Sequence, residues 1–166
     1  MYDFLILGGD ERMYCLFKML RKNYTSKMDM WEEKAEKNEV FEDIKNSKNI
    51  ILPIPSTRDK KTLNAPKSSL IIDICDIQNV LCDGQRLFYG LTSESENLIT
   101  HKNSYNLLND KRYTLQNSHT TAEITAKIIN EKYKFDAKNS VVLISGYGKI
   151  AKNLAEILKS ESNKVY

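Results

Sequence analysis

The sequence predicts an α/β protein, in which a parallel sheet of about five strands carries helices on both faces. Short apolar runs of strand length recur along the chain, and charged or amphipathic segments of helix length separate them. Such alternation is typical of parallel strands joined by right-handed crossover connections. Hydrophobic residues make up 41% of the 166 residues and charged residues 28%, which is the composition of a globular protein.

The charge balance and the cysteine content exclude several other classes of protein. The 25 Lys and Arg residues exceed the 22 Asp and Glu residues by only three, which argues against a main function in nucleic-acid binding. No apolar run approaches the ~18 residues of a membrane span, and the N-terminus lacks the pattern of a signal peptide. The three cysteines form no CxxC pair, so we expect a cytoplasmic protein without a disulfide scaffold or a metal site.

The first strand and the first helix are predicted from adjacent patterns. Residues 4–7 are a continuous apolar run that stops at Gly8 and Gly9, as expected for a strand buried on both faces. Asp10 stands where a helix N-cap is expected. The apolar residues that follow have the spacing of an amphipathic helix: Met13, Leu16, Phe17 and Leu20. The chain therefore begins as strand, glycine turn and helix.

The middle of the chain repeats this alternation less clearly. Strands are predicted at residues 49–54, 69–75 and 86–91 from their apolar runs, and a shorter, weaker one at residues 112–115. The charged segment of residues 32–45 is predicted to be a helix. Together with the first strand, these segments would form one sheet.

The last fifty residues or so predict a long helix followed by a new strand and helix. Residues 120–132 contain no helix breaker, and Ser118 or Thr120 could cap their start. Residues 140–145 read as a buried strand, and residues 164–166 as the beginning of another. The helix between them carries an apolar stripe: Ile150, Leu154, Ile157 and Leu158.

A glycine motif joins the strand at 140–145 to that last helix. Gly146 and Gly148 with Ala151 match the dinucleotide-binding pattern G-x-G-x-x-G/A. The first glycine makes the turn, the second admits a pyrophosphate, and the helix N-terminus, opened by Lys149 and Ile150, offers unpaired N–H groups. We predict that Gly146, Gly148, Lys149 and Ile150 belong to an NAD- or NADP-binding site. The alternative is a strand-to-helix turn that needs glycine for its backbone alone.

The dinucleotide pattern is incomplete at its acidic residue. A carboxylate that binds the ribose 2′-hydroxyl is expected ~20 residues after the first glycine, and Tyr166 is already 166 − 146 = 20 residues away. We therefore expect only the truncated beginning of a nucleotide domain. Weak NAD(P) binding, or none, is the consequence, because most cofactor contacts come from later elements.

Two arginines follow predicted strands, in the turns where open α/β sheets bind their ligands. Arg12 comes just after the first strand, and Ser56 and Arg58 come just after the second. An arginine fork matches a carboxylate, so we predict that Arg12, Ser56 and Arg58 form a substrate-binding site for an anion. The alternative is that Arg12 is a solvated charge and that the second segment is an edge loop stiffened by prolines. No general acid or base is identifiable.

Five blocks of the sequence, taken in order, resemble the A subunit of dipicolinate synthase. The blocks are ILGGDER (6–12), ILPIPSTRDKKTLNAP (51–66), LFYGL (87–91), NSHTTAE (117–123) and VVLISGYGKIAKNLAEIL (141–158). The resemblance implies a flavodoxin-like substrate-side domain over residues 1–116 and a connector helix over 117–135. Residues 136–166 would then begin a Rossmann domain that binds NAD or NADP.

The resemblance also implies an activity and partners. Members of this family are NAD(P)-dependent oxidoreductases that act in sporulation with a flavoprotein-like B subunit. They convert a dihydro- or hydroxytetrahydro-dipicolinate precursor into pyridine-2,6-dicarboxylate. The site would lie at the connector helix, where Thr121 and Glu123 are candidates to position substrate or nicotinamide. Two alternatives remain, a fragment of another 2-hydroxyacid dehydrogenase and a non-catalytic flavodoxin-like binding module, and the chain could form a homo-oligomer.

Overall fold

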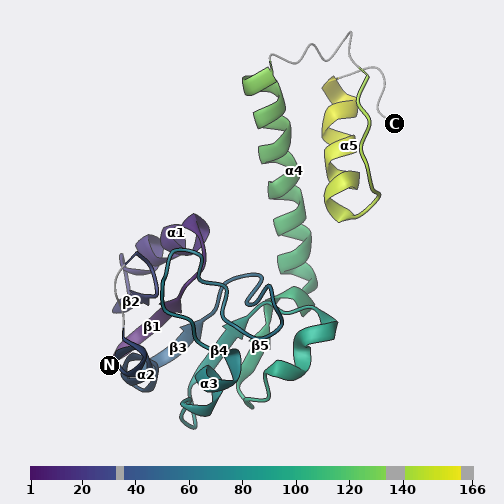
Figure 1. Ribbon diagram of the computed structural model, residues 1–166. Helices are drawn as coiled ribbons and strands as arrows, with labels where there is room; N and C mark the ends of the chain where they lie inside the picture. The colour runs from purple at the N-terminus through teal and green to yellow at the C-terminus, as the bar shows by residue number, and fades with distance from the viewer. Residues whose placement is uncertain (33–35, 134–140, 162–166) are drawn as a thin grey trace. The chain divides into compact units, whose positions relative to one another are not determined.

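The computed structural model describes residues 1–32, 36–133 and 141–161 (Figure 1). The chain divides into two compact units, Met1–Leu108 and Asn109–Tyr166. The expected boundary between residues 116 and 117 falls inside a helix of the second unit.

The first unit is built on a parallel sheet of five strands, which confirms the predicted fold class. The strand order is β2-β1-β3-β4-β5, the order of flavodoxin-like doubly wound folds. It reverses between β1 and β3, so the crevice beyond their carboxyl ends is where such folds bind ligands. The strands are β1 (Tyr2–Leu7), β2 (Ser26–Asp29), β3 (Ser47–Ile51), β4 (Arg86–Tyr89) and β5 (Ser104–Asn106).

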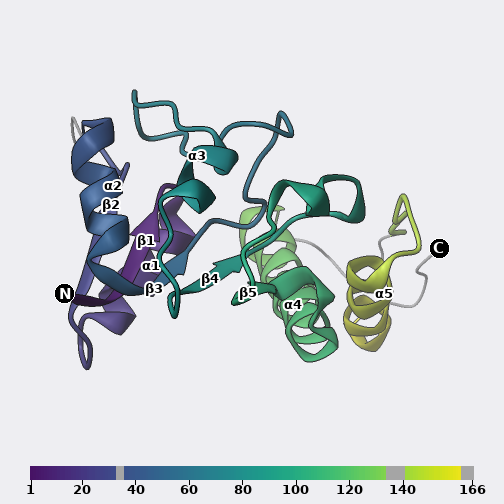
Figure 2. The same ribbon diagram turned by 90° about the horizontal axis from the view of Figure 1, so that it is seen from below.

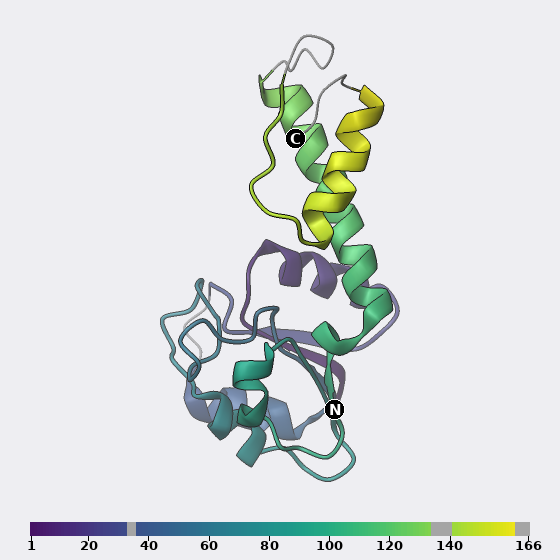
Figure 3. The same cartoon turned by 90° about the vertical axis from the view of Figure 1, so that its right-hand side faces the viewer.

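Helices cover both faces of this sheet. Figures 2 and 3 show α1 on one face and α2 and α3 on the other. The α-helices are α1 (Glu11–Leu20), α2 (Lys37–Lys45) and α3 (Ile74–Asn79), and the 3-10 turns are η1 (Ser93–Leu98) and η2 (Leu107–Asn109). As predicted, Asp10 caps α1, and its carboxylate accepts a hydrogen bond of 3.0 Å from the backbone N–H of Arg12.

The hydrophobic core explains why the central strands were predictable. Alternate residues of β1, β3 and β4 face α2 and α3 and are fully buried, including Leu5, Ile50 and Leu87. Ile6, on the other face of β1, is also fully buried. A strand buried on both faces has to be apolar at every position, which is the run that its sequence displays.

In the first unit, the sequence analysis missed two edge strands and predicted one strand that is wrong. β2 and β5, with the sequences SKMD and SYN, lie at the edges of the sheet, so they carry little of the apolar signal. Residues 69–73 form a loop and residues 74 and 75 begin α3, so this segment is not a strand. Ile72 and Ile74 are buried in the core while Ile71 is 72% exposed, so the apolar run fills the core without joining the sheet.

The helix predicted at residues 32–45 begins later, at Lys37. Glu36 and Glu39 form a capping box at its start, which satisfies backbone N–H groups that have no partner within the helix. Val40 and Ile44 then bury one face of α2 against the sheet. Residues 33–35 of the predicted helix lie outside the described residues.

The second unit pairs α4 (Lys111–Tyr133) with α5 (Lys149–Glu161). The strand predicted at residues 112–115 is wrong, because these residues form the first turn of α4. Asp110 caps that turn by accepting a hydrogen bond of 2.9 Å from the Tyr113 N–H. Ser118, one of the two predicted caps, is instead buried inside the helix and accepts a hydrogen bond of 3.1 Å from Asn153 of α5.

The segment before α5 differs from its prediction, whereas α5 itself confirms the predicted last helix. The described part of the expected strand at 140–145 is not a strand, and Val141 and Leu143 are 67% and 81% exposed. The first strand of a dinucleotide-binding sheet lies between two neighbours, and the described residues 141–161 supply none. Residue 140 and residues 164–166 lie outside the described residues.

Candidate functional site

The strand order places the candidate site in the crevice beyond the carboxyl ends of β1 and β3. The loop of residues 8–10 follows β1 and leads into α1, while residues 52–58 follow β3. Arg58 ends the second segment, and Arg12 lies in the first turn of α1, directly after the first segment. The topology therefore gathers at one edge of the sheet residues that are more than forty positions apart in sequence.

Two glycines let the first loop pack closely against a third segment. Gly8 and Gly9 have φ angles of 61° and 92°, which side-chain-bearing residues rarely adopt. A Cβ atom on Gly8 would lie 2.7 Å from Ala65 Cβ, and one on Gly9 would lie 2.3 Å from Met13 Cγ. The Gly9 N–H donates a hydrogen bond of 2.9 Å to the Asn64 carbonyl. The two glycines thus allow the loop after β1 to pack directly against residues 64 and 65.

Arg12 ties the two strand-end loops together. Its Nε and Nη2 atoms donate to the two carboxylate oxygens of Asp10 at 2.9 and 2.8 Å. The same Nη2 donates to the Ile54 carbonyl oxygen at 3.0 Å. The Arg12 side chain is nevertheless 70% exposed. Its guanidinium group thus joins the loop after β1 to the loop after β3 and remains largely exposed to solvent.

Arg58 acts on the same carboxylate as Arg12. Hydrogen bonds from Arg12 hold the pKa of Asp10 below its ordinary value, and the charge of Arg58 lowers that pKa further. Arg12 contacts Asp10 directly, whereas Arg58 acts on it through its charge alone. Arg58 is exposed and borders an open hollow of about 300 Å³, which is lined by Arg58, Asp59, Thr62, Leu63, Asn64, Ala65 and Pro66.

Ser56, the third residue predicted to bind substrate, is buried and already bonded. Its hydroxyl donates to the Pro53 carbonyl at 2.7 Å and accepts from the Gly90 N–H at 2.9 Å. The Ser56 N–H donates to the Gly90 carbonyl at 2.9 Å. A serine hydroxyl has one hydrogen to donate, so none is left for a ligand. Ser56 joins the loop after β3 to the residue that follows β4 and so fixes the backbone of the loop that carries Arg58.

Sequence reasoning missed Asp59, which fixes the backbone next to Arg58. Its carboxylate accepts hydrogen bonds from the N–H groups of Lys61 and Thr62 at 2.9 and 2.8 Å, and from the hydroxyls of Thr57 and Thr62 at 2.8 and 2.6 Å. Hydrogen bonds from Thr62 are the largest cause of a pKa of Asp59 well below its ordinary value. The available signal was an aspartate followed closely by polar residues in a loop, the pattern of an Asx turn.

Thr121 and Glu123 lie in the second unit, on α4. The Thr121 hydroxyl donates to the Asn117 carbonyl at 2.7 Å. Glu123 is exposed, and its Oε1 lies 3.4 Å from Nε2 of His119, one turn earlier. Because α4 begins at Lys111, both residues lie well inside the helix and not at its start. Their function in binding substrate or nicotinamide stays a prediction.

The predicted dinucleotide motif does not form a pocket in the described residues. Gly146 has a φ angle of 115°, but a Cβ atom placed on Gly146 or Gly148 would meet no atom within 4 Å. Lys149 donates to the Thr114 hydroxyl at 3.2 Å, and Ile150 is 43% exposed. The pyrophosphate cradle needs a strand packed beside the helix N-terminus, and that packing is missing from residues 141–161. We therefore derive no chemistry from a cofactor at this motif.

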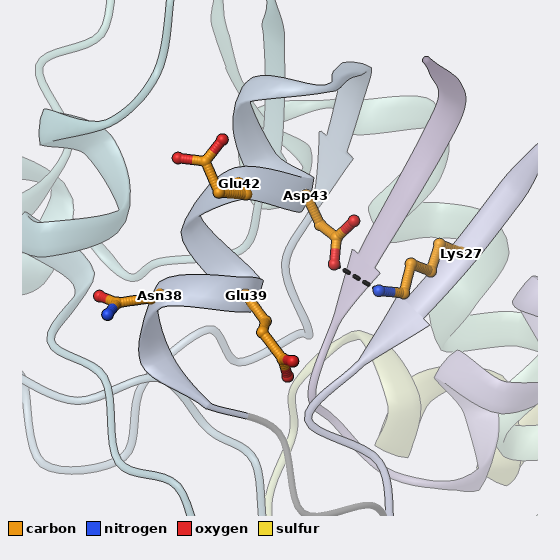
Figure 4. Close-up of a pocket in the computed structure, with 5 residues that line it drawn as sticks. All are labelled: Lys27, Asn38, Glu39, Glu42 and Asp43. Carbon is orange, nitrogen blue, oxygen red and sulfur yellow. Dashed lines mark hydrogen bonds and ion pairs between the residues drawn. The ribbon is translucent and has the colours of Figure 1, made fainter.

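A different hollow of about 470 Å³ lies on the α2 side of the sheet (Figure 4). Its lining is Lys27, Asn38, Glu39, Glu42 and Asp43. Lys27 forms ion pairs with Asp43 and, at 3.2 Å, with Asp29. Burial raises the pKa of Asp29 to about 6. The described residues contain neither a group of three or more potential metal ligands nor a helix long and apolar enough to cross a membrane.

Comparison with known families decides the relationship of the chain. The family model of the N-terminal domain of the dipicolinate synthase A subunit matches residues 3–109. The chain belongs to this family. The matched region coincides closely with the first unit, Met1–Leu108, which holds the crevice described above. No curated protein matches the chain.

Two solved structures show the same fold. The dipicolinate synthase A subunit from Bacillus halodurans shares 20% sequence identity, with a TM-score of 0.70. The alignment covers 98% of this chain and 59% of that one. The A chain of dipicolinate synthase from Bacillus subtilis shares 17% identity, with a TM-score of 0.68, over 98% of this chain and 58% of that one. The chain thus spans less than two thirds of the length of these structures.

Proposed function

We propose that the first unit is the substrate-side domain of an oxidoreductase of the dipicolinate synthase type, and that it binds a small dicarboxylate in the crevice beyond β1 and β3. One observation carries the proposal. The segment that carries Arg12 and the segment that carries Arg58 follow β1 and β3, where the strand order reverses, and Arg12 bonds to the Ile54 carbonyl of the second segment. Membership of the family supports the choice of a dicarboxylate.

Arg58 is the exposed cation of the hollow of about 300 Å³. The carboxylate of Asp59, which also lines the hollow, already accepts hydrogen bonds from the Lys61 and Thr62 N–H groups. Arg12 already bonds to Asp10 and to the Ile54 carbonyl, so we assign it the second, weaker carboxylate contact. Arg58 is the primary ligand, because a planar fork can bind a carboxylate through two parallel hydrogen bonds. Ser56 and Asp59 would hold the Arg58 loop in place without touching the substrate.

The redox step belongs to the proposal for the whole enzyme. A nicotinamide cofactor, NAD or NADP, would accept the hydride, and a flavoprotein-like B subunit would be the partner in sporulation. Residues 141–161 form no dinucleotide pocket in this structure. We therefore propose that this chain binds NAD(P) weakly or not at all, and that Gly146, Gly148, Lys149 and Ile150 contribute only beside further elements.

Titration calorimetry with pyridine-2,6-dicarboxylate tests the substrate part of the proposal. Arg58→Lys keeps the charge but loses the fork, so we expect binding to weaken by roughly tenfold. Arg86→Lys is the matched control, because Arg86 is exposed at the amino end of β4, the opposite end of the sheet. Equal affinities of the wild-type chain and Arg58→Lys would refute the assignment of Arg58.

A second candidate function is a non-catalytic flavodoxin-like binding module. The open environment of Gly146 and Gly148 favours it, since it leaves the dinucleotide motif without its cradle. The two candidates differ in turnover. Reduction of NAD or NADP by the chain and its flavoprotein-like partner, in the presence of a dihydrodipicolinate precursor, would support the enzyme. Dicarboxylate binding without any turnover in that mixture would support the module.

A further inference from the structure

β2 is an edge strand with free hydrogen-bonding groups. Among the described residues it pairs only with β1, and it borders the sheet in Figure 1. The Gly8 N–H donates to the Asp29 carbonyl at 2.9 Å, so Asp29 faces β1. Successive residues of a parallel strand direct their backbone groups to opposite sides. Ser26 and Met28 therefore direct their N–H and C=O groups away from the sheet.

An aromatic hollow of about 630 Å³ flanks this edge on the α1 side. Tyr14 and Trp31 stack there with ring centroids 5.3 Å apart and an interplanar angle of 2°. Phe17 contacts Tyr14 at a centroid distance of 6.4 Å, and Met28 of β2 itself contributes to the lining. Rings that are already held in place offer contact area at little cost in conformational entropy. Arg21, Lys27 and Glu32 complete the lining, so this side of the edge offers ring surface to an apolar side chain beside charged groups.

The opposite, α2 side of the same edge is acidic. The hollow of about 470 Å³ in Figure 4 presents Glu39, Glu42 and Asp43, with Lys27 as the cation of its lining. Asp29 lies at the end of β2 and is 8% exposed, and its Oδ2 atom has no hydrogen-bond partner in the described part of the chain. A buried carboxylate oxygen without a donor is costly. This side of the edge favours a basic side chain.

Lys27 does not protect the edge as an edge lysine usually does. Exposed lysines on edge strands discourage pairing by projecting their charge toward an incoming strand. Here the Lys27 ammonium group bonds to Asp43, as Figure 4 shows, and to Asp29 at 3.2 Å. These ion pairs raise the pKa of Lys27 although partial burial opposes them. Its charge is thereby drawn over the α2 face and away from the open backbone of β2.

We propose that the β2 edge binds an extended segment of a partner polypeptide in which apolar and basic residues alternate. Its backbone would pair with Ser26 and Met28, as in other cases of strand addition to a sheet edge. Because side chains of a strand alternate between faces, its apolar residues would enter the aromatic hollow and its basic residues the acidic one.

Charge complementarity selects this occupant over a second copy of the chain. Antiparallel pairing of two β2 edges about a two-fold axis keeps equivalent faces together. It would bring two acidic α2 hollows side by side, with Glu39, Glu42 and Asp43 of both copies on one face. Like charges placed together across an interface oppose association. A basic partner segment meets no such repulsion.

The test uses a short peptide with blocked ends in which phenylalanine alternates with lysine. Trp31 is the single tryptophan of the chain and lines the aromatic hollow, so its fluorescence reports binding there. We expect saturable fluorescence changes together with amide NMR shifts at Ser26 and Met28. A backbone N-methylated peptide of the same sequence cannot pair with the edge, and we expect no binding.

Charge reversal on the acidic side supplies the matched variants. Glu42→Lys should weaken peptide binding by about tenfold. Glu94→Lys is the control and should leave peptide binding unchanged. Both glutamates are exposed and pair with a lysine, Glu94 at 2.8 Å and Glu42 at 2.7 Å, but Glu94 lies on η1 and not on α2. Equal binding of a phenylalanine–glutamate peptide, amide shifts at β5 instead of β2, or concentration-dependent self-association through β2 would each overturn the proposal.

Discussion

Replacement of Ser56 by alanine separates a supporting function from a ligand function. The substitution removes the hydroxyl that accepts from the Gly90 N–H and donates to the Pro53 carbonyl, both in a fully buried position. A buried polar group that loses its partner costs about 1–3 kcal/mol. Two such groups predict a loss of roughly 2–6 kcal/mol in the free energy of unfolding of the first unit. This is a large part of the roughly 5–15 kcal/mol that stabilises a typical domain.

The assay is urea denaturation followed by the fluorescence of Trp31, which lies in the first unit and so reports that unit alone. Ser93→Ala is the control, because Ser93 is exposed at the start of η1, and surface substitutions of this kind usually change stability by less than about 0.5 kcal/mol. If Ser56→Ala lowers the free energy of unfolding as little as the control does, this reasoning is refuted and the hydroxyl becomes a candidate to bind the substrate.

Three further predictions concern titration, cofactor and packing. Burial raises the pKa of Asp29 to about 6, above its unfolded value of roughly 3.9. The folded state then binds more protons than the unfolded state between these values, so stability rises by up to about 2–3 kcal/mol as the pH falls from about 7 to about 4. Asp29→Asn should remove this rise in urea titrations across that range, and an unchanged pH profile would contradict it. NADH should bind the chain with a dissociation constant no tighter than about 1 mM by titration calorimetry, and micromolar binding would show that residues 141–161 form a cofactor site after all. Gly8→Ala should destabilise the first unit by about 1–3 kcal/mol in urea denaturation, because its Cβ would lie 2.7 Å from Ala65 Cβ at a φ of 61°, while Gly84→Ala, which also has a positive φ but open space around it, should lose less.

The central strands of the fold were predictable because burial on both faces leaves a continuous apolar run. β1 follows this rule in its second half, and β3 and β4 follow it only after the exposed Lys48 and Arg86; all three overlap their predicted runs. β2 and β5 did not show it, since an edge strand has one open side and needs few apolar residues. Residues 69–75 show the converse error: Ile72 and Ile74 fill the core from a loop and a helix start, and their burial imitates a strand.

The beginning of α4 shows a limit of local signals. Several polar residues near residue 120 could serve as caps, and Asp110 was overlooked because an apparent strand occupied residues 112–115. The structure shows that Asp110 caps the helix. Strand propensity over four residues is weak evidence against a helix of twenty-three residues that packs on α5.

The position of the candidate site follows from the strand order, whereas the function of its residues in binding stays a prediction. The rule that ligands bind beyond the carboxyl ends of strands placed Arg12 and Arg58 in one crevice, because it depends only on strand order. The bond from Arg12 to Ile54 and the bond from Gly90 to the buried Ser56 depend on tertiary contacts between segments far apart in sequence. The dinucleotide motif was recognisable from spacing alone, whereas its cradle depends on packing that residues 141–161 lack.

The most direct test of the central claim compares two ligands in two proteins by titration calorimetry. Pyridine-2,6-dicarboxylate and pyridine-2-carboxylate are titrated into the wild-type chain and into Arg58→Lys. If Arg58 binds one carboxylate and Arg12 the other, the wild-type chain prefers the dicarboxylate, and the substitution weakens the binding of both ligands by roughly tenfold, because both use Arg58 as the primary contact. Unchanged affinities in Arg58→Lys, or no preference for the dicarboxylate in the wild-type chain, would contradict a dicarboxylate site between β1 and β3.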